Sequence, residues 1–398
     1  MSSPDVVSSL TDFATADEIS RLSTIVGHER PHPIHLLLER EGGLSQHRVN
    51  VDNALRQVSI ANRPWLDKMK GRIIGKDVTE ASATLAELRA YGYLLEAGFS
   101  VNPIAATNQR ATPEFIVSDG VDEFVVEVHA KQQNAETEKE LSAQRKAIAD
   151  EPRESGKITT HVHVVHPWGR PSAEKKGDST TKKAISRICA IKGREHQLRA
   201  DIPSVVWMDF QDLHTWDMAL GPEQFNPLLS WRDHITSGAI YYALYGWKGA
   251  PVYEQVHYSH LDLPSQIQQM EHDGRFRLST LASAVIVSLP TATILAETPR
   301  TARQLSPSVR LRCLGLPHAG LQHSIAEWTT GQVASTLNAN AKLICGLIGE
   351  KPPVDYLAFA SFASETESRS RSERLWWTPI AALIGASVGY LIAGRRKR

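Results

Sequence analysis

Short strand-like runs alternate with helical segments between residues 84 and 290, and this alternation restricts the chain to a mixed architecture. In the clearest helix, 84–99, leucines recur at helical spacing and Gly98 stands where a helix would end. Runs of strand character lie at 99–104, 114–118, 123–130, 161–166, 204–210, 238–246 and 283–290. We therefore expect an α/β fold rather than an all-α or all-β one.

The stretch 112–132, TPEFIVSDGVDEFVVEVHAKQ, contains two of these strands joined by the turn signal DGVD, and it predicts a hairpin. Side chains alternate faces along a strand, so Glu127, His129 and Lys131 project to one side. Glu114 opens the neighbouring strand and can approach Glu127. Two close carboxylates suit Mg²⁺ or Mn²⁺, and a basic group beside them can serve an attacking water or a phosphate.

These residues resemble the motif of the PD-(D/E)XK, or restriction-endonuclease-like, nuclease superfamily. Thr112–Phe115 is similar to its TPDF strand, Val126–Val128 to its following acidic strand, and Glu87 to an additional acidic ligand that many members place on the preceding helix. The resemblance implies a core of helix, three-stranded antiparallel or mixed sheet, helix and strand. It also implies that Glu114, Glu127 and Glu87 bind Mg²⁺ or Mn²⁺.

Two positions depart from that pattern. Glu114 replaces an aspartate, and His129 stands where the superfamily has lysine, with Lys131 two residues further on the same face. Lys131, or else His129, is the expected catalytic group. The same departures suit a domain that no longer cuts and serves as a nucleic-acid-binding or scaffolding module, and an ordinary half-solvated hairpin is a third interpretation.

A basic segment follows the predicted hairpin. Lys183, Arg187 and Arg194 align on one face of a predicted helix, provided that Gly193 does not end that helix early. Such a stripe would contact phosphates without reading sequence, with DNA expected in preference to RNA. A solvated helix face explains the same charges.

Two other clusters offer metal ligands. His161 and His163 share a strand face, and Asp209, Asp212, His214 and Asp217 follow a predicted buried strand. We rank the aspartate cluster second to the hairpin site and the histidine pair below it. The three cysteines are far apart and form no CxxC pair, so neither a disulfide framework nor a thiolate zinc site is indicated.

The run 376–394 carries no charge, begins with two tryptophans and is followed by RRKR. About 20 apolar residues span a bilayer as a helix, and tryptophan favours its boundary, so we expect one transmembrane helix here. A buried terminal helix is the alternative. The N-terminus has no apolar segment typical of a secretory signal, so we expect the soluble part to lie in the cytoplasm.

Together these features predict a mainly helical region at 1–75, a nuclease-like α/β domain with insertions at 76–350, a linker at 351–375 and the membrane helix at 376–394. The expected function is metal-dependent hydrolysis of nucleic-acid phosphodiesters at a membrane. The alternatives are the non-cutting scaffold and an effector whose membrane segment itself causes damage.

Overall fold

The structure is a computed structural model, and it describes residues 6–27, 30–39, 45–105, 112–132, 135–150, 168, 171–172, 178–189, 197–211, 221–226, 228–231, 234–254, 256–257, 268–277, 281–298, 301 and 303–319. All of these residues belong to one unit, Met1–Ile325. The expected linker and membrane helix, and the predicted strand 161–166, lie outside the described residues.

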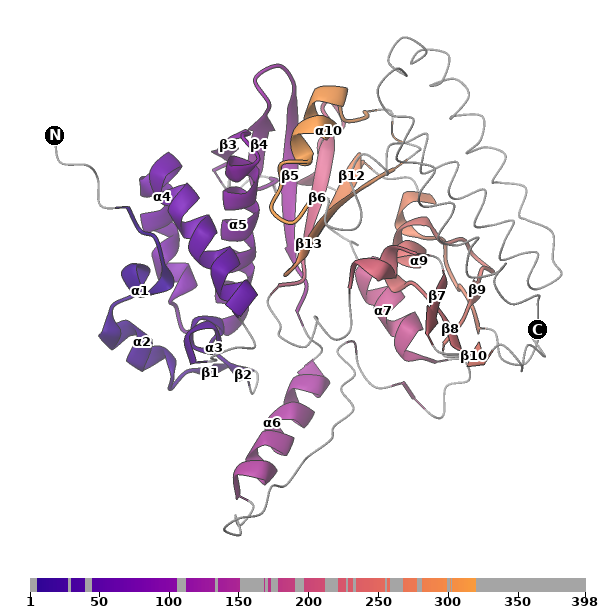
Figure 1. Cartoon of the computed structure of the whole chain (residues 1–398), viewed down its shortest axis with the longest axis horizontal. Helices are drawn as coiled ribbons and strands as arrows, with labels where there is room; N and C mark the ends of the chain where they lie inside the picture. The colour runs from indigo at the N-terminus through magenta and orange to yellow at the C-terminus, as the bar shows by residue number, and fades with distance from the viewer. Residues whose placement is uncertain are drawn as a thin grey trace, which may run out of the picture. The chain divides into compact units, whose positions relative to one another are not determined.

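A six-stranded mixed sheet forms the centre of the unit, with the strand order β13-β12-β6-β5-β4-β3 (Figure 1). Its strands are β3 (Ser100–Pro103), β4 (Phe115–Ser118), β5 (Glu123–Ala130), β6 (Ser204–Asp209), β12 (Ala284–Leu289) and β13 (Ala292–Glu297). The first three pair antiparallel, β6 lies parallel to both β5 and β12, and β13 returns antiparallel. The α/β class predicted from the sequence is confirmed.

The predicted hairpin is the β4–β5 pair. Ser118 pairs with Glu123, and in the turn Asp119 Oδ1 accepts hydrogen bonds from the backbone N–H groups of Val121 and Asp122. An aspartate that accepts from the residues that follow it closes a tight turn by itself. The DGVD signal therefore fixes the register that brings Phe115 opposite Val126.

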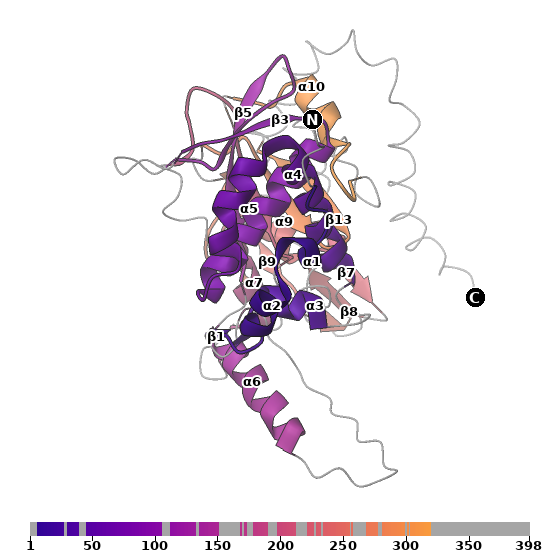
Figure 2. The same cartoon turned by 90° about the vertical axis from the view of Figure 1, so that its left-hand side faces the viewer.

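Helices precede the sheet in the chain. They are α1 (Leu10–Phe13), α2 (Ala16–Leu22), α3 (Pro33–Glu39), α4 (Ser45–Ile73) and α5 (Val78–Glu96), with a short pair of strands, β1 (Val26–Gly27) and β2 (Arg30–Pro31), between α2 and α3. Helix α4 kinks at Asn62, two residues before Pro64. Figure 2 shows α4 and α5 side by side.

Helix α5 is the predicted helix 84–99, begun six residues earlier. Asp77 caps its start by accepting from the N–H groups of Thr79 and Glu80. Gly98 ends it with φ +81°, as the sequence predicts. On the α4 side, a Cβ on Gly92 would lie 2.5 Å from Ala54 Cα, so only glycine permits this close approach.

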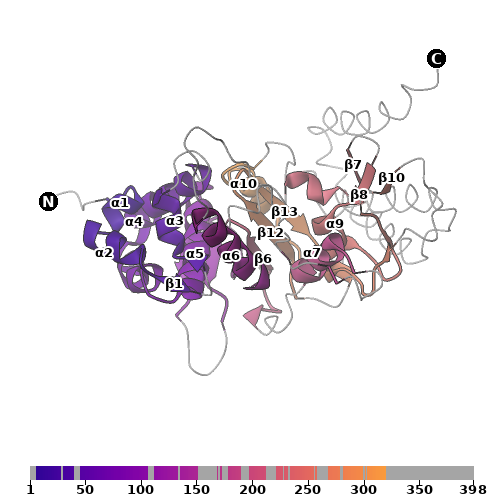
Figure 3. The ribbon, with the colours of Figure 1, turned by 90° about the horizontal axis from the view of Figure 1, so that it is seen from below.

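Strand alternation gives the sheet two different faces. Val126 and Val128 of β5 and Val205 and Trp207 of β6 join the core beneath α5. The residues between them, including Glu127 and His129, point to the opposite face. Helix α7 (Thr180–Cys189), in the crossover from β5 to β6, reaches that opposite face, because the Lys131 ammonium lies 3.5 Å from the carbonyl oxygen of Arg187. Figure 3 shows α5 and α7 on either side of the strands.

One predicted strand is wrong. The run 238–246 forms helix α9 (Ala239–Tyr245), which packs against α7 and is buried along its whole length. A short run that is apolar on every side has no period by which strand and helix can be told apart. The tyrosine hydroxyl of Tyr245 donates to the carbonyl oxygen of Glu297 at the end of β13, which joins α9 to the sheet.

The remaining described elements lie outside the central sheet. They are α6 (Ala135–Asp150), β7 (Leu228–Trp231), β8 (His234–Ser237), β9 (Pro251–Val252), β10 (Val256–His257), β11 (Gln268–Gln269) and α10 (Pro307–Cys313). Strands β7, β8 and β10 form one small sheet and β9 and β11 another. The described cysteines, Cys189 and Cys313, are free thiols.

Candidate functional site

Glu114 sits where β4 begins, at the edge of its pairing with β5. Its N–H donates to the carbonyl oxygen of Val126, and its side-chain Oε2 accepts from the N–H of Val128 at 2.7 Å. The carboxylate thus takes the place of the next backbone carbonyl of the ladder. Because it is held at the strand's edge, it can reach groups on both faces of the sheet.

The carboxyl groups of Glu114 and Glu127 lie close enough to interact. Burial raises the pKa of Glu114, and the Glu127 side chain and the N–H of Val128 oppose that rise. Glu127 is fully buried, on the face of β5 opposite the α5 core. Two ionised carboxylates this close repel each other, and a proton or a cation between them would relieve that repulsion.

The two basic candidates follow on the same face of β5. His129 Nε2 lies 3.5 Å from Glu127 Oε1, and both side chains are buried. Lys131 is also buried, with its ammonium directed at the C-terminal turn of α7 through the Arg187 carbonyl. The structure therefore brings Glu114, Glu127 and His129 together, whereas Lys131 follows on the same face and contacts α7.

Glu87 approaches the pair from α5. Its negative charge contributes to the raised pKa of Glu114, which places the two carboxylates within electrostatic reach of each other. Both oxygens of Glu87, however, accept from the guanidinium of Arg72, each at 3.2 Å. Burial raises the pKa of Glu87 and the Arg72 charge opposes that rise.

The predicted basic stripe lies partly within the described residues. Lys183 and Arg187 are on α7, where Arg187 is exposed and Lys183 makes a 3.3 Å ion pair with Asp178. Arg194 lies outside the described residues. Since the Arg187 carbonyl contacts Lys131, this end of α7 lies beside the residue that follows β5.

Asp209, the first residue of the second-ranked aspartate cluster, is already paired with another side chain. Asp209 is fully buried and forms a bidentate ion pair with Arg89 of α5, with Nε–Oδ2 at 2.9 Å and Nη2–Oδ1 at 2.7 Å. A carboxylate matched in this way to a guanidinium serves packing rather than metal binding, because both of its oxygens are already used. Asp212, His214, Asp217 and the histidines 161 and 163 lie outside the described residues.

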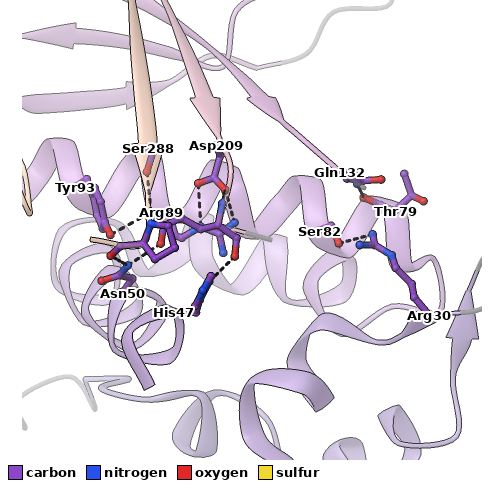
Figure 4. A network of polar contacts seen from close by, with 12 residues as sticks. Arg30, His47, Asn50, Thr79, Ser82, Arg89, Tyr93, Gln132, Asp209 and Ser288 are labelled. Atoms are coloured by element: carbon purple, nitrogen blue, oxygen red, sulfur yellow. Dashed lines mark hydrogen bonds and ion pairs between the residues drawn. The ribbon is translucent and has the colours of Figure 1, made fainter. Parts of the chain in front are cut away.

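A buried polar network surrounds that ion pair, and sequence reasoning missed it (Figure 4). The Gln211 side-chain amide donates to Ser288 at 2.7 Å and to the Tyr93 hydroxyl, and it accepts from Asn50 of α4. His47 contacts the Gln211 carbonyl oxygen at 2.7 Å. The network joins α4 and α5 to the ends of β6 and β12. An arginine at position 89, on the buried face of a helix, was the one signal of it in the sequence.

Within the described part of the chain, no three His, Cys, Asp or Glu side chains gather as ligands for a metal ion. The donor chemistry of the Glu114–Glu127 pair nevertheless fits a hard divalent cation, since both ligands are carboxylates and one cation would relieve their mutual repulsion.

No described helix is long and apolar enough to cross a bilayer. No family model, curated protein or solved structure matches the chain.

Proposed function

We propose that the chain is a Mg²⁺- or Mn²⁺-dependent nuclease of the restriction-endonuclease-like kind. The observation that carries this proposal is the meeting of Glu114 and Glu127 at the β4–β5 junction, with His129 and Lys131 next along the same face. Like-charged groups buried together lower stability, so they are kept where chemistry needs them.

The order of elements supports the proposal. Helix α5, the antiparallel strands β3, β4 and β5, helices α6 and α7 and the parallel strand β6 follow one another in the sequence. The resemblance in the motif implies a succession of helix, three strands, helix and strand, which this order matches apart from the additional helix. Motif and topology are independent of each other, because a hairpin with acidic residues occurs in many sheets of other topology.

In the proposed mechanism Glu114 and Glu127 would hold a divalent cation, whose chemistry would be to polarise the phosphodiester and to make an attacking water more acidic. Lys131, buried at the end of β5, orients that water or stabilises charge on the phosphate. His129, at 3.5 Å from Glu127, positions that carboxylate and is the alternative base. Lys183 and Arg187 contact the phosphates of a nucleic acid, DNA in preference to RNA.

The test uses the purified full-length chain, in detergent micelles if required, with single- and double-stranded DNA and RNA. We expect cleavage with Mg²⁺ or Mn²⁺ that EDTA stops. Glu127→Gln should reduce the rate at least about 100-fold, more than is typical for loss of a residue that only supports a ligand. Glu123→Gln is the matched control, because Glu123 lies on the same strand and is exposed.

If the wild-type chain binds nucleic acid but cuts none with either metal, the non-cutting scaffold replaces the enzyme. That alternative is favoured by the departures at Glu114 and His129 from the superfamily pattern. If the chain does cut, Lys131→Ala and His129→Ala assign the basic role. The variant that lowers turnover by about 10²-fold or more while leaving Mn²⁺ affinity unchanged identifies the catalytic group.

We further propose that residues 376–394 tether the chain to a membrane, with the rest in the cytoplasm. The support is the charge-free run with its tryptophans at one end and RRKR at the other. Truncation near residue 370 should move the chain from the membrane to the soluble fraction. A full-length chain that is soluble without detergent would disprove the tether, whatever the outcome of the cleavage assay.

A further inference from the structure

Arg72, in the last turn of α4, forms ion pairs with two carboxylates of α5. Its Nε lies 2.9 Å from Glu80 Oε1, and its two terminal nitrogens lie 3.2 Å from the two oxygens of Glu87. Nη1 also donates to the sulfur of Met69 at 3.3 Å. A guanidinium held on several sides in this way has little freedom to leave, so the Arg72–Glu87 pair is a fixed part of the site.

The pair matters because Glu87 is the carboxylate that lies within electrostatic reach of Glu114. A carboxylate whose two oxygens both accept from a guanidinium can bind a metal ion only by breaking at least one of those hydrogen bonds. The positive charge of Arg72 also repels a divalent cation brought close to Glu87. Arg72 therefore competes with a cation for the third acidic group of the site.

We propose that Arg72 takes the place of a second cation, so that the site binds a single divalent ion on Glu114 and Glu127 while Glu87 stays with the guanidinium. This inference rests on the proposed function, and it makes Arg72 a positioning residue that sets how many ions bind and how tightly. It predicts one-ion chemistry, with a fixed guanidinium beside the acidic pair where a second ion would otherwise reside.

Mn²⁺ binding by the full-length chain tests the inference without any cleavage assay. Isothermal titration calorimetry gives the affinity and stoichiometry, and electron paramagnetic resonance of free Mn²⁺ checks both. The wild type should bind one ion per chain. Arg72→Gln should bind Mn²⁺ on the order of tenfold more tightly or gain a second ion, because a repelling charge is removed and Glu87 is released. Arg72→Lys, which keeps the charge without the bidentate geometry, should fall between them.

The matched control is Arg63→Gln. Arg63 belongs to the same helix and pairs with Asp67 at 2.7 Å on the surface, so its loss should leave Mn²⁺ binding unchanged. The double variant Arg72→Gln, Glu87→Gln should lose the gain of the single variant, because that gain requires the released carboxylate. Melting temperatures of the metal-free proteins identify any variant that does not fold, and Arg72→Lys then carries the test.

The outcomes separate this inference from the function on which it rests. Two ions bound by the wild type, or equal affinity of the wild type and both Arg72 variants, would overturn the inference while leaving the nuclease intact. If the wild type binds no Mn²⁺, or if Glu127→Gln binds it as well as the wild type does, the proposed metal site fails and the inference fails with it. Tighter binding in Arg72→Gln that vanishes in the double variant supports both.

Discussion

Asp209 and Glu127 are two fully buried carboxylates on adjacent parallel strands, and their surroundings differ completely. Asp209 faces α5 and meets the Arg89 guanidinium in two short hydrogen bonds. Glu127 faces the other side of the sheet and meets a second carboxyl group, that of Glu114. One cluster is balanced in charge within itself, whereas the other brings like charges together.

This difference separates structure from function more clearly than burial does. Burying a carboxylate is costly, but a bidentate guanidinium and a surrounding amide network offset that cost around Asp209. The Glu114–Glu127 contact adds repulsion to burial, and a proton, a cation between the two groups or a protonated His129 would offset it. We conclude that Asp209 anchors the fold, and we infer that Glu127 belongs to the candidate site.

Replacing each carboxylate by its amide tests this conclusion, and we expect the larger loss of stability at Asp209. Asp209→Asn leaves the Arg89 guanidinium buried without its negative partner. We expect the free energy of unfolding to fall by about 3–5 kcal/mol, the usual range for breaking a buried ion pair from one side. Urea unfolding of the metal-free full-length chain measures it.

A second variant shows whether the charge is the cause. Arg89→Met combined with Asp209→Leu removes both charges and should recover most of the stability lost in Asp209→Asn. If the double replacement is as unstable as the single one, shape and the Gln211 network, rather than charge balance, hold this region together.

Much of the fold could be predicted from the sequence because it rests on local signals. The DGVD turn, the cap at Gly98 and the apolar runs of β6 and β12 each act within a few residues. Helix α9 could not be predicted, since its surroundings are apolar on every side and only tertiary packing selects helix over strand.

The candidate site, like the fold, could be predicted from the sequence only where local rules apply. Strand alternation is a local rule, and it sufficed to put Glu127, His129 and Lys131 on one face opposite the α5 core. The partners of Arg89 and Arg72 could not be predicted from local patterns. Asp209 is 120 residues from Arg89 in the chain, and Arg72 contacts two acidic groups on α5, Glu80 and Glu87, between which the sequence does not choose. Charge pairing across elements depends on packing that no short window of sequence contains.

His32 is a third buried titratable side chain to set beside Asp209 and Glu127, and it stays neutral at pH 7. His32 is buried, contacts the Gly75 carbonyl oxygen through Nε2 at 3.0 Å and accepts from the Ile34 N–H through Nδ1. Burial, helped by the neighbouring Arg30, His35 and Arg21 charges and opposed by the hydrogen bond to the Gly75 carbonyl, lowers its pKa to about 4. Protonation would also break the bond from Ile34, since Nδ1 could no longer accept.

The folded pKa of His32 lies below the unfolded value near 6.5, so the folded state binds the proton less well. The stability contributed by neutral His32 is complete above about pH 6.5 and is lost as pH falls towards 4. We expect a loss on the order of 2 kcal/mol across this window. Urea unfolding at each pH should show it as the difference between the wild type and His32→Gln, with His272→Gln, a change at an exposed histidine, as the control. Equal pH profiles for wild type and His32→Gln would contradict it.

The smallest effect, and the one of opposite sign, is expected at Glu127. Glu127→Gln keeps the shape and the hydrogen-bonding capacity of the side chain and removes one of two charges that repel each other. The metal-free protein should be as stable as the wild type or more stable by about 1 kcal/mol at pH 7, where Asp209→Asn loses several. A loss of 3 kcal/mol or more would show that Glu127 is an anchor like Asp209.

If the Glu114–Glu127 pair is a metal site, adding Mn²⁺ should make the wild type more stable than Glu127→Gln, the reverse of the order expected without metal. A ligand that binds only the folded state stabilises it, by about 2.7 kcal/mol at 100 times its dissociation constant. The wild type should gain stability with Mn²⁺ and overtake Glu127→Gln, which has lost a carboxylate ligand, while Asp209→Asn should still gain because its change lies on the opposite face of the sheet. The sign of the difference between the wild type and Glu127→Gln, measured without and with Mn²⁺, therefore decides whether this like-charged pair is held for a cation.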